Sequence, residues 1–132
     1  MLSQEELIRY DRQIMMPEIG REGQGRLKAA KVFIAGVGGL GSPVSIYLAA
    51  AGVGHIKIAD HDTIEISNLN RQILHWNEDL GRRKVDSAMD KLRRMNPDIK
   101  LEITHETITE KNIPQMVDGF DAIVDAMDNF KT

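Results

Sequence analysis

Short apolar runs alternate along the chain with segments of helical character. The apolar runs have the length and side-chain pattern of strands, and they fall at residues 31–35, 55–60, 100–104 and 121–126. The segments between them, at residues 42–51, 83–95 and 109–117, are predicted to be helices. Strands and helices that alternate in this order favour a parallel sheet. The pattern therefore predicts an α/β fold with a Rossmann-like, doubly wound, mostly parallel sheet.

The first 30 residues are predicted to form a helical segment that precedes the sheet. Ser3 and Glu6 have the spacing of a capping box, so we expect a helix to begin there, and Pro17 would help to end it. The apolar stripe of this helix is expected at Leu7, Ile8, Ile14 and Met15. Residues 18–25 contain three glycines and are predicted to be a loop. Residues 62–76 are polar and irregular, with room for scattered helical turns.

The length of 132 residues fits one domain, but the predicted sheet stops early. The fourth strand should be central in a doubly wound sheet, yet the chain ends at Thr132, directly after it. We therefore expect a single domain fragment over residues 1–132. It would consist of the helical segment at residues 1–30 and a Rossmann-like half at residues 31–132, truncated after about the fourth strand.

Composition and charge narrow the classes of function. A chain that is 42% hydrophobic and 28% charged, with a net charge of −3, is typical of a globular protein without general affinity for nucleic acid or an anionic membrane. There is no cysteine, so these residues hold no disulfide, no thiol nucleophile and no cysteine-bound zinc. The acidic start and the lack of a long apolar span predict a soluble, cytoplasmic protein.

A glycine motif lies where the first predicted strand meets the following helix. Gly36-x-Gly38-x-x-Gly41 has the spacing of the dinucleotide-binding fingerprint. Such glycines let the backbone approach a phosphate, and the helix N-terminus adds positive partial charge. Asp60 ends the next strand, where an acid can bond ribose hydroxyls. Alternatively, the glycines only permit close packing of strand and helix, but the flanking elements and Asp60 favour nucleotide binding.

Charged residues that come after Asp60 in the sequence indicate which kind of nucleotide is bound. Arg71 and Lys84 come shortly after the ribose acid, and charge-assisted bonds from two cations suit a triphosphate better than a pyrophosphate. Taken alone, both residues fit a solvated surface better than a site. Asp128 lies just beyond the fourth strand, at the edge of the sheet where ligands bind. Its carboxylate could hold Mg²⁺ or cap the following helix.

Several motifs occur in an order and spacing that are specific as a set, although each is weak alone. They are Arg9-Tyr10-Asp11-Arg12-Gln13-Ile14, the glycines at residues 36–41, Asp60-x-Asp62, Ser67-Asn68-Leu69-x-Arg71-Gln72, Lys84 and Asp128-Asn129. Over essentially the whole chain, this set resembles the ThiF/MoeB/HesA family, which is related to the adenylation domains of ubiquitin-activating enzymes.

The resemblance implies a role for each matching residue. ATP would be bound by Gly36, Gly38, Gly39, Gly41, Asp60, Asn68, Arg71, Lys84 and Asn129. The catalytic residues would be Arg12, Arg71, Lys84 and Asp128. Asp128 would bind Mg²⁺, and Arg12 would reach into the site of a partner subunit, so a complete site implies a homodimer.

The resemblance also implies a reaction, the ATP-dependent adenylation of a C-terminal glycine carboxylate. The substrate would be a small ubiquitin-like sulfur carrier that ends in Gly-Gly, and carriers of molybdopterin, thiamin or amino-acid biosynthesis all fit. Family members continue with further strands and often with paired zinc cysteines. Zinc is therefore possible only in a C-terminal part beyond these residues, and the fragment alone is expected to be inactive.

Two other functions stay open. An NAD-binding oxidoreductase domain would use the same glycine turn, but the set of charged residues would then be unexplained. A non-catalytic nucleotide-binding partner subunit would be expected to lack the phosphate-binding cations, which this chain has. The histidines have no ligand spacing and are predicted to be structural or surface residues: His55, His61, His75 and His105.

Overall fold

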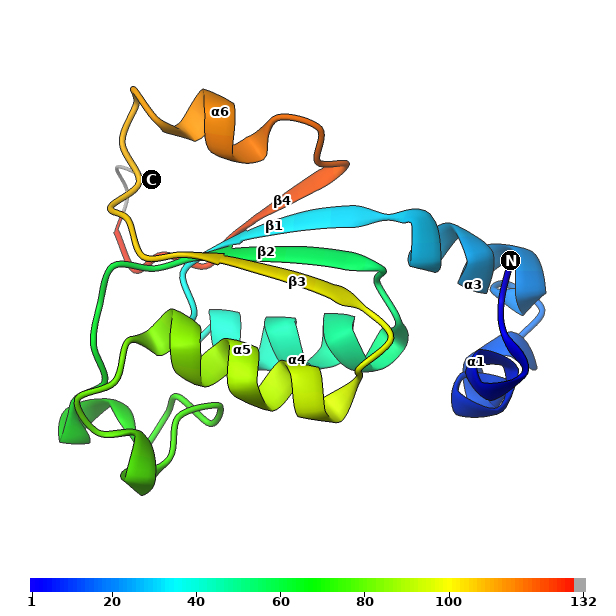
Figure 1. Cartoon of the computed structure of the whole chain (residues 1–132), viewed down its shortest axis with the longest axis horizontal. Coiled ribbons are helices and arrows are strands. Elements are labelled where there is room, and N and C mark those ends of the chain that lie inside the picture. Colours follow the sequence, from blue (N-terminus) through cyan, green and yellow to red (C-terminus); the bar gives the residue numbers. More distant parts are fainter. Residues whose placement is uncertain (130–132) are drawn as a thin grey trace.

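The described part of the chain contains one parallel sheet of four strands. The computed structural model describes residues 1–129, and the strands are β1 (Lys31–Ala35), β2 (His55–Ala59), β3 (Lys100–Thr104) and β4 (Ala122–Asp125). All neighbouring strands are parallel, in the order β3-β2-β1-β4 (Figure 1). The predicted α/β fold with a Rossmann-like parallel sheet is confirmed.

Helices cover both faces of the sheet (Figure 1). α4 (Gly41–Ala51) and α5 (Lys84–Met95) lie on one face, and the shorter α6 (Ile113–Val117) lies on the other. Each of these helices matches a predicted one. α4 ends as expected, because Gly52 adopts the left-handed conformation with a φ of 88°.

Side chains of β1 alternate between two buried clusters. Ile34 joins Ile56 and Leu92 in the larger cluster, which lies against α4 and α5. Phe33 points to the opposite face and packs with Met116 of α6. Full burial of such a side chain stabilises the fold by about 1.5–3 kcal/mol. β1 is thus packed on both of its faces.

The single helix predicted at the N-terminus is wrong, although its capping box of Ser3 and Glu6 is present. The chain instead forms α1 (Gln4–Arg9) and α2 (Asp11–Ile14), which are separated at Tyr10. The Tyr10 side chain is buried, and its hydroxyl accepts a hydrogen bond of 2.7 Å from the Asn96 amide. Burying this ring turns the chain and interrupts the helix. Two residues of the expected apolar stripe are consequently exposed: Ile8 and Met15.

The loop predicted at residues 18–25 is also wrong, because α3 (Gly20–Ala29) occupies most of this segment. Its Gln24 is fully buried, and Nε2 donates to the Ala51 carbonyl oxygen over 2.9 Å. Leu27 packs against the larger core cluster. Each glycine costs a helix about 1 kcal/mol relative to alanine, and tertiary contacts of this kind outweigh that penalty.

The segment between β2 and α5 is irregular, and residues 62–76 within it were predicted to be so. It contains two short 3₁₀ helices, η1 (Ile66–Asn68) and η2 (Asn77–Asp79). A single isolated bridge between Thr63 and Arg83 joins its two ends. Among residues 1–129, no helix combines the length and the apolar character needed to cross a membrane.

Candidate functional site

A cavity of about 670 Å³ lies at the carboxyl ends of β1, β2 and β4. The strand register pairs Ala35 with both Ala59 and Asp125, so the residues that follow these three gather at one edge of the sheet. Open α/β sheets bind their ligands at this edge. The cavity is lined by Gly36, Gly38, Gly39, Leu40, Asp60, His61, Asp62, Arg71, Gln72, Lys84, Ala126, Met127, Asp128 and Asn129.

The turn between β1 and α4 forms one wall of the cavity. Gly36 has a φ of 92°, and a Cβ at this position would lie 2.9 Å from the Ala126 carbonyl oxygen. A Cβ at Gly41 would overlap the Gly36 carbonyl oxygen. Close packing of β1, β4 and α4 therefore requires both of these glycines, whereas Gly38 and Gly39 line the cavity without such contacts to backbone.

α4 begins at this wall without a side-chain cap. Leu40 occupies the N-cap position and offers no hydrogen bond from its side chain. The Ser42 N–H donates to the Gly38 carbonyl oxygen over 3.0 Å, and Pro43 has no N–H, so α4 contributes mainly the positive partial charge of its dipole at this end. The end of α4 that meets the cavity is therefore suited to an anion.

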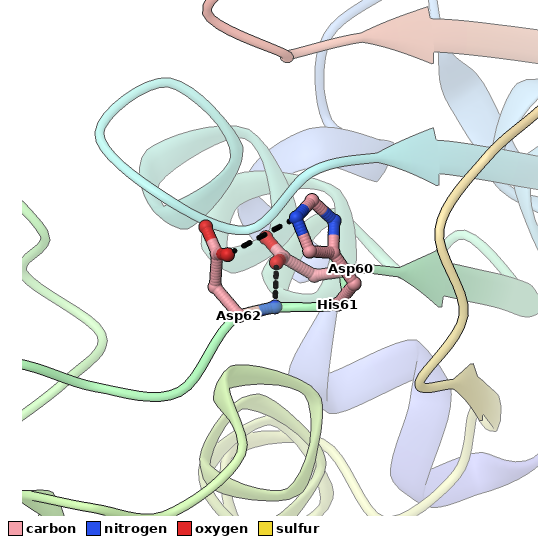
Figure 2. Close-up of side chains that lie close together, drawn as sticks. All are labelled: Asp60, His61 and Asp62. Carbon is pink, nitrogen blue, oxygen red and sulfur yellow. Dashed lines mark hydrogen bonds and ion pairs between the residues drawn. The ribbon is translucent and has the colours of Figure 1, made fainter.

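The Asp60 side chain forms hydrogen bonds to the backbone of two segments that border the cavity. This residue follows β2 and is 7% exposed. Its Oδ2 accepts the Val37 N–H over 2.9 Å, and its Oδ1 accepts the Asp62 N–H over 2.8 Å. Figure 2 shows this carboxylate beside His61, whose Nε2 lies 3.2 Å from Asp62 Oδ1. Each carboxylate oxygen has further lone-pair capacity, so Asp60 can still accept a hydrogen bond from a ligand hydroxyl.

Two cations reach the cavity, Arg71 from the segment that follows β2 and Lys84 from the start of α5. Lys84 is the first residue of α5, and its buried ammonium group lies 3.5 Å from Asp62 Oδ2. Arg71 is exposed, and its guanidinium donates to the Ser67 carbonyl oxygen over 2.7 Å. A negatively charged ligand in the cavity would face both groups. Lys84 is 6% exposed, so it is not the solvated surface residue that its position in the sequence, taken alone, would suggest.

Asp128 and Asn129 follow β4 and bring oxygen ligands to the same cavity. Mg²⁺ is usually held by one or two protein carboxylates together with phosphate and water oxygens. Asp128 and Asp62 offer such carboxylates, so the donor set fits this ion. A second possible group is Asp60, His61 and Asp62, whose ligand atoms lie within 4.8 Å of one another. It suits Mg²⁺ less well, because His61 offers nitrogen and Asp60 already accepts two backbone N–H groups.

Three predicted site residues do not line the cavity. Gly41 lies in the first turn of α4, and Asn68 lies in η1, where its Oδ1 accepts the Glu65 N–H over 2.8 Å. Arg12 is exposed on α2, with its guanidinium 3.9 Å from the Met15 sulfur. The N-terminal helices lie at the opposite end of the sheet from the cavity (Figure 1). Arg12 is therefore far from the cavity of its own chain.

The sequence motifs include Asp62 and Gln72 but assigned them no role, and four further lining residues were not proposed for the site: Leu40, His61, Ala126 and Met127. The signal that could have found His61 is its place directly after the second strand, between Asp60 and Asp62. His61 was predicted only as a structural or surface residue. It also lines a second hollow of about 300 Å³, which adjoins the cavity and shares Met127 and Asn129 with it.

Residues 10–132 match the model of the ThiF family. This protein belongs to the ThiF family. The match includes the glycine turn, Asp60 and every other residue that lines the cavity. The family resemblance expected from the ordered motifs is thereby confirmed.

Similar proteins of this family are longer than the chain. It is 47% identical over 131 residues to the adenylyltransferase and sulfurtransferase MOCS3 of Culex quinquefasciatus, covering 99% of the chain and 30% of that protein. It is 45% identical over 130 residues to the sulfur carrier protein adenylyltransferase of Thermus thermophilus, covering 98% of the chain and 48% of that protein. The structure of the tRNA N6-threonylcarbamoyladenosine dehydratase TcdA of E. coli, in complex with ATP, superposes with a TM-score of 0.91 at 26% identity, covering 98% of this chain and 53% of that one. The chain spans about a third to a half of the length of these proteins.

The two kinds of glycine in the turn should respond differently to an added methyl group. Gly41→Ala should lower the free energy of unfolding by about 1–3 kcal/mol, because backbone must move to admit the new Cβ. Gly39→Ala is the matched control: the nearest atom to its Cβ is the Arg71 Cγ at 3.9 Å. Its effect should stay within about 0.5 kcal/mol. Urea unfolding of both variants measures the difference, and equal losses would contradict this division of the turn.

Proposed function

We propose that these residues are the nucleotide-binding part of an enzyme that uses ATP and Mg²⁺ to adenylate the C-terminal glycine carboxylate of a small ubiquitin-like sulfur-carrier protein. The observation that carries the proposal is the convergence of Arg71, Lys84 and Asp128 on one cavity, together with the glycine turn and Asp60. The names of the Culex and Thermus relatives, both adenylyltransferases, support it.

ATP would lie along the carboxyl edge of the sheet. Asp60 would accept hydrogen bonds from the ribose hydroxyls, and the adjoining second hollow would receive the base. The triphosphate would then extend past the N-terminus of α4 toward Arg71 and Lys84. A phosphate oxygen near Lys84 would compete with Asp62 for its ammonium group, which lies at 3.5 Å from that carboxylate. Each charge-assisted contact of this kind contributes roughly 1.5–3 kcal/mol.

The chemical step would be a displacement at the α-phosphorus of ATP. An oxygen of the carrier carboxylate forms the new bond to phosphorus, and the bond to the oxygen that bridges the α- and β-phosphates breaks. The electron pair of that bond leaves with pyrophosphate, and the other product is the acyl-adenylate. Arg71 and Lys84 would stabilise the charge that develops on the phosphate oxygens.

The carrier itself supplies the nucleophile, because a C-terminal carboxylate is ionised at neutral pH. The chain needs no activated serine or cysteine for this step, and it contains no cysteine. Its contribution would be to position the two reactants and to offset charge.

The metal and the partner residues complete the proposed site. Asp128 would hold Mg²⁺, with Asn129 beside it, and bound Mg²⁺ would supply charge neutralisation to the phosphate oxygens. Arg12 would act in the cavity of a second copy, which makes the enzyme a homodimer. Its place on α2, far from the cavity of its own chain, supports this assignment. We expect the enzyme to work in the cytoplasm.

The reaction is tested by isotope exchange between ATP and pyrophosphate. The whole protein should catalyse exchange that depends on a Gly-Gly-tailed carrier, because the acyl-adenylate forms reversibly only when a carboxylate is present. The control is the same carrier with its two terminal glycines removed, which should give background exchange. Exchange at the full rate without any carrier would exclude this substrate class.

The dimeric site is tested by complementation between two inactive variants of the whole protein. Arg12→Ala and Asp128→Ala should each lose most exchange activity alone. Mixing them should restore about a quarter of wild-type activity, because random subunit exchange gives hybrid dimers with one intact site of two in half of the molecules. Native mass spectrometry checks that subunits exchange. If hybrids form and stay inactive, Arg12 does not act across the interface.

A further inference from the structure

A buried histidine contacts the glycine turn from behind the cavity wall. His75 lies between η1 and η2 and is 2% exposed. Its Nε2 is 2.8 Å from the Val37 carbonyl oxygen, and its Nδ1 is 2.9 Å from the Ser87 Oγ. Within the described chain, the residues that line the cavity include none of these three. They therefore support the wall without belonging to its surface.

The hydrogen-bond partners determine which imidazole nitrogen carries the proton. A carbonyl oxygen only accepts, so Nε2 must carry hydrogen and donate to Val37. On the other side of the ring, the Lys91 ammonium only donates, and it lies 2.7 Å from the Ser87 Oγ. Ser87 therefore accepts from Lys91 and donates its own proton to the bare Nδ1 of His75. This arrangement requires a neutral imidazole protonated on Nε2.

The charges around the ring favour this neutral form. Burial lowers the pKa of His75, and the cations Lys91 and Lys84 lower it further, against the opposing effects of the Val37 carbonyl and Asp79. Lys91 is itself held by the carboxylate of Asp79. Burial acts to raise the pKa of Asp79, but the hydrogen bond from Lys91 and others outweigh it, so this carboxyl stays ionised. A chain from Asp79 through Lys91 and Ser87 thus ends on the imidazole.

The contact with His75 sets the direction of the amide group that joins residues 37 and 38. A trans peptide is planar, and its C=O and N–H point in opposite directions. Because the Val37 carbonyl points at the buried His75, the Gly38 N–H must point the other way, on the side where Gly38 lines the cavity. Within residues 1–129 this N–H makes no hydrogen bond. Asp60 holds the preceding N–H of Val37, so the carbonyl and the amide of Val37 are both fixed.

We propose that His75 is a positioning residue for nucleotide binding: it directs the Gly38 N–H toward a phosphate of the bound nucleotide, and Ser87 and Lys91 hold it in the tautomer that this requires. The inference rests on the proposed function and adds a backbone donor to the site. It also connects the glycine turn to α5, which carries Ser87 and Lys91 as well as the cavity residue Lys84.

Two substitutions of His75 by residues with amide side chains test its two hydrogen bonds separately. In His75→Gln the amide nitrogen takes the place of Nε2 and can donate to Val37. In His75→Asn the shorter amide takes the place of Nδ1 and can reach only Ser87. The whole protein is titrated with Mg·ATP by calorimetry, and thermal unfolding shows whether each variant is folded. The Gln variant should bind Mg·ATP with a Kd within about threefold of the wild-type value. The Kd of the Asn variant should be roughly tenfold higher or more, which is the effect expected from losing one charge-assisted hydrogen bond.

Equal affinity of the folded Gln and Asn variants for Mg·ATP would overturn the inference. A histidine with only a structural role would change the melting temperature of the variants and leave the ratio of their two affinities at one. If wild type fails to bind Mg·ATP, the proposed function is wrong, and that outcome is separate. A second measurement needs no ligand, and it can contradict the inference even if the Asn variant does not fold. The ring nitrogen shifts of His75 in wild type, assigned by their loss in His75→Gln, should show hydrogen on Nε2 and none on Nδ1 at neutral pH. Hydrogen on Nδ1 would overturn the inference.

Discussion

The Asp60 carboxylate is the constraint on which the site depends. One of its oxygens accepts the Val37 N–H and the other accepts the Asp62 N–H, so it fastens the turn after β1 to the segment after β2. Both turns start from neighbouring parallel strands, and nothing in the strand pairing itself fixes the directions in which they leave the sheet. The two hydrogen bonds to Asp60 fix these directions, because its buried carboxylate would be costly to leave without hydrogen-bond partners. The carboxylate is thereby oriented, with its remaining lone pairs available to a ligand.

The cavity is lined by side chains of both charge signs. Two cations, Arg71 and Lys84, and the carboxylates of Asp62 and Asp128 line it, and the Lys84 ammonium lies 3.5 Å from Asp62 Oδ2. In a complex of a nucleotide with Mg²⁺, the phosphates would pair with the cations Arg71 and Lys84, and the metal ion would pair with the carboxylates. A dinucleotide such as NAD has a pyrophosphate and needs no metal, so it would leave part of this arrangement without a partner. The balance of charges therefore favours a metal-bound triphosphate.

Periodicity and motif spacing were enough to predict the sheet, its helices and the residues that form most of the cavity. Gly38, Asp60 and Asp128 come together because each follows a predicted strand whose place in the parallel sheet is fixed by topology. Arg71 and Lys84 reach the same cavity from the irregular segment after β2 and from the start of α5. This convergence is a consequence of the fold, and it does not by itself establish the role of any one residue.

The errors arose where a long-range contact decides the local structure. The glycines of residues 20–25 suggest a loop, but the buried Gln24 is anchored to the end of α4 and keeps the segment helical. The break at Tyr10 follows from a hydrogen bond to Asn96, which is 86 positions away. His75 has no motif around it, and its partners Val37 and Ser87 lie in other parts of the chain. Such residues can be recognised only when the partners that satisfy their buried polar atoms are known.

The most direct test of the central claim is a calorimetric titration of the whole protein with ATP in the presence of Mg²⁺, followed by the same titration with NAD. The account predicts saturable binding of one ATP per chain that weakens when Mg²⁺ is removed, with NAD binding far more weakly. Tighter binding of NAD than of Mg·ATP, or ATP binding that is indifferent to Mg²⁺, would contradict it.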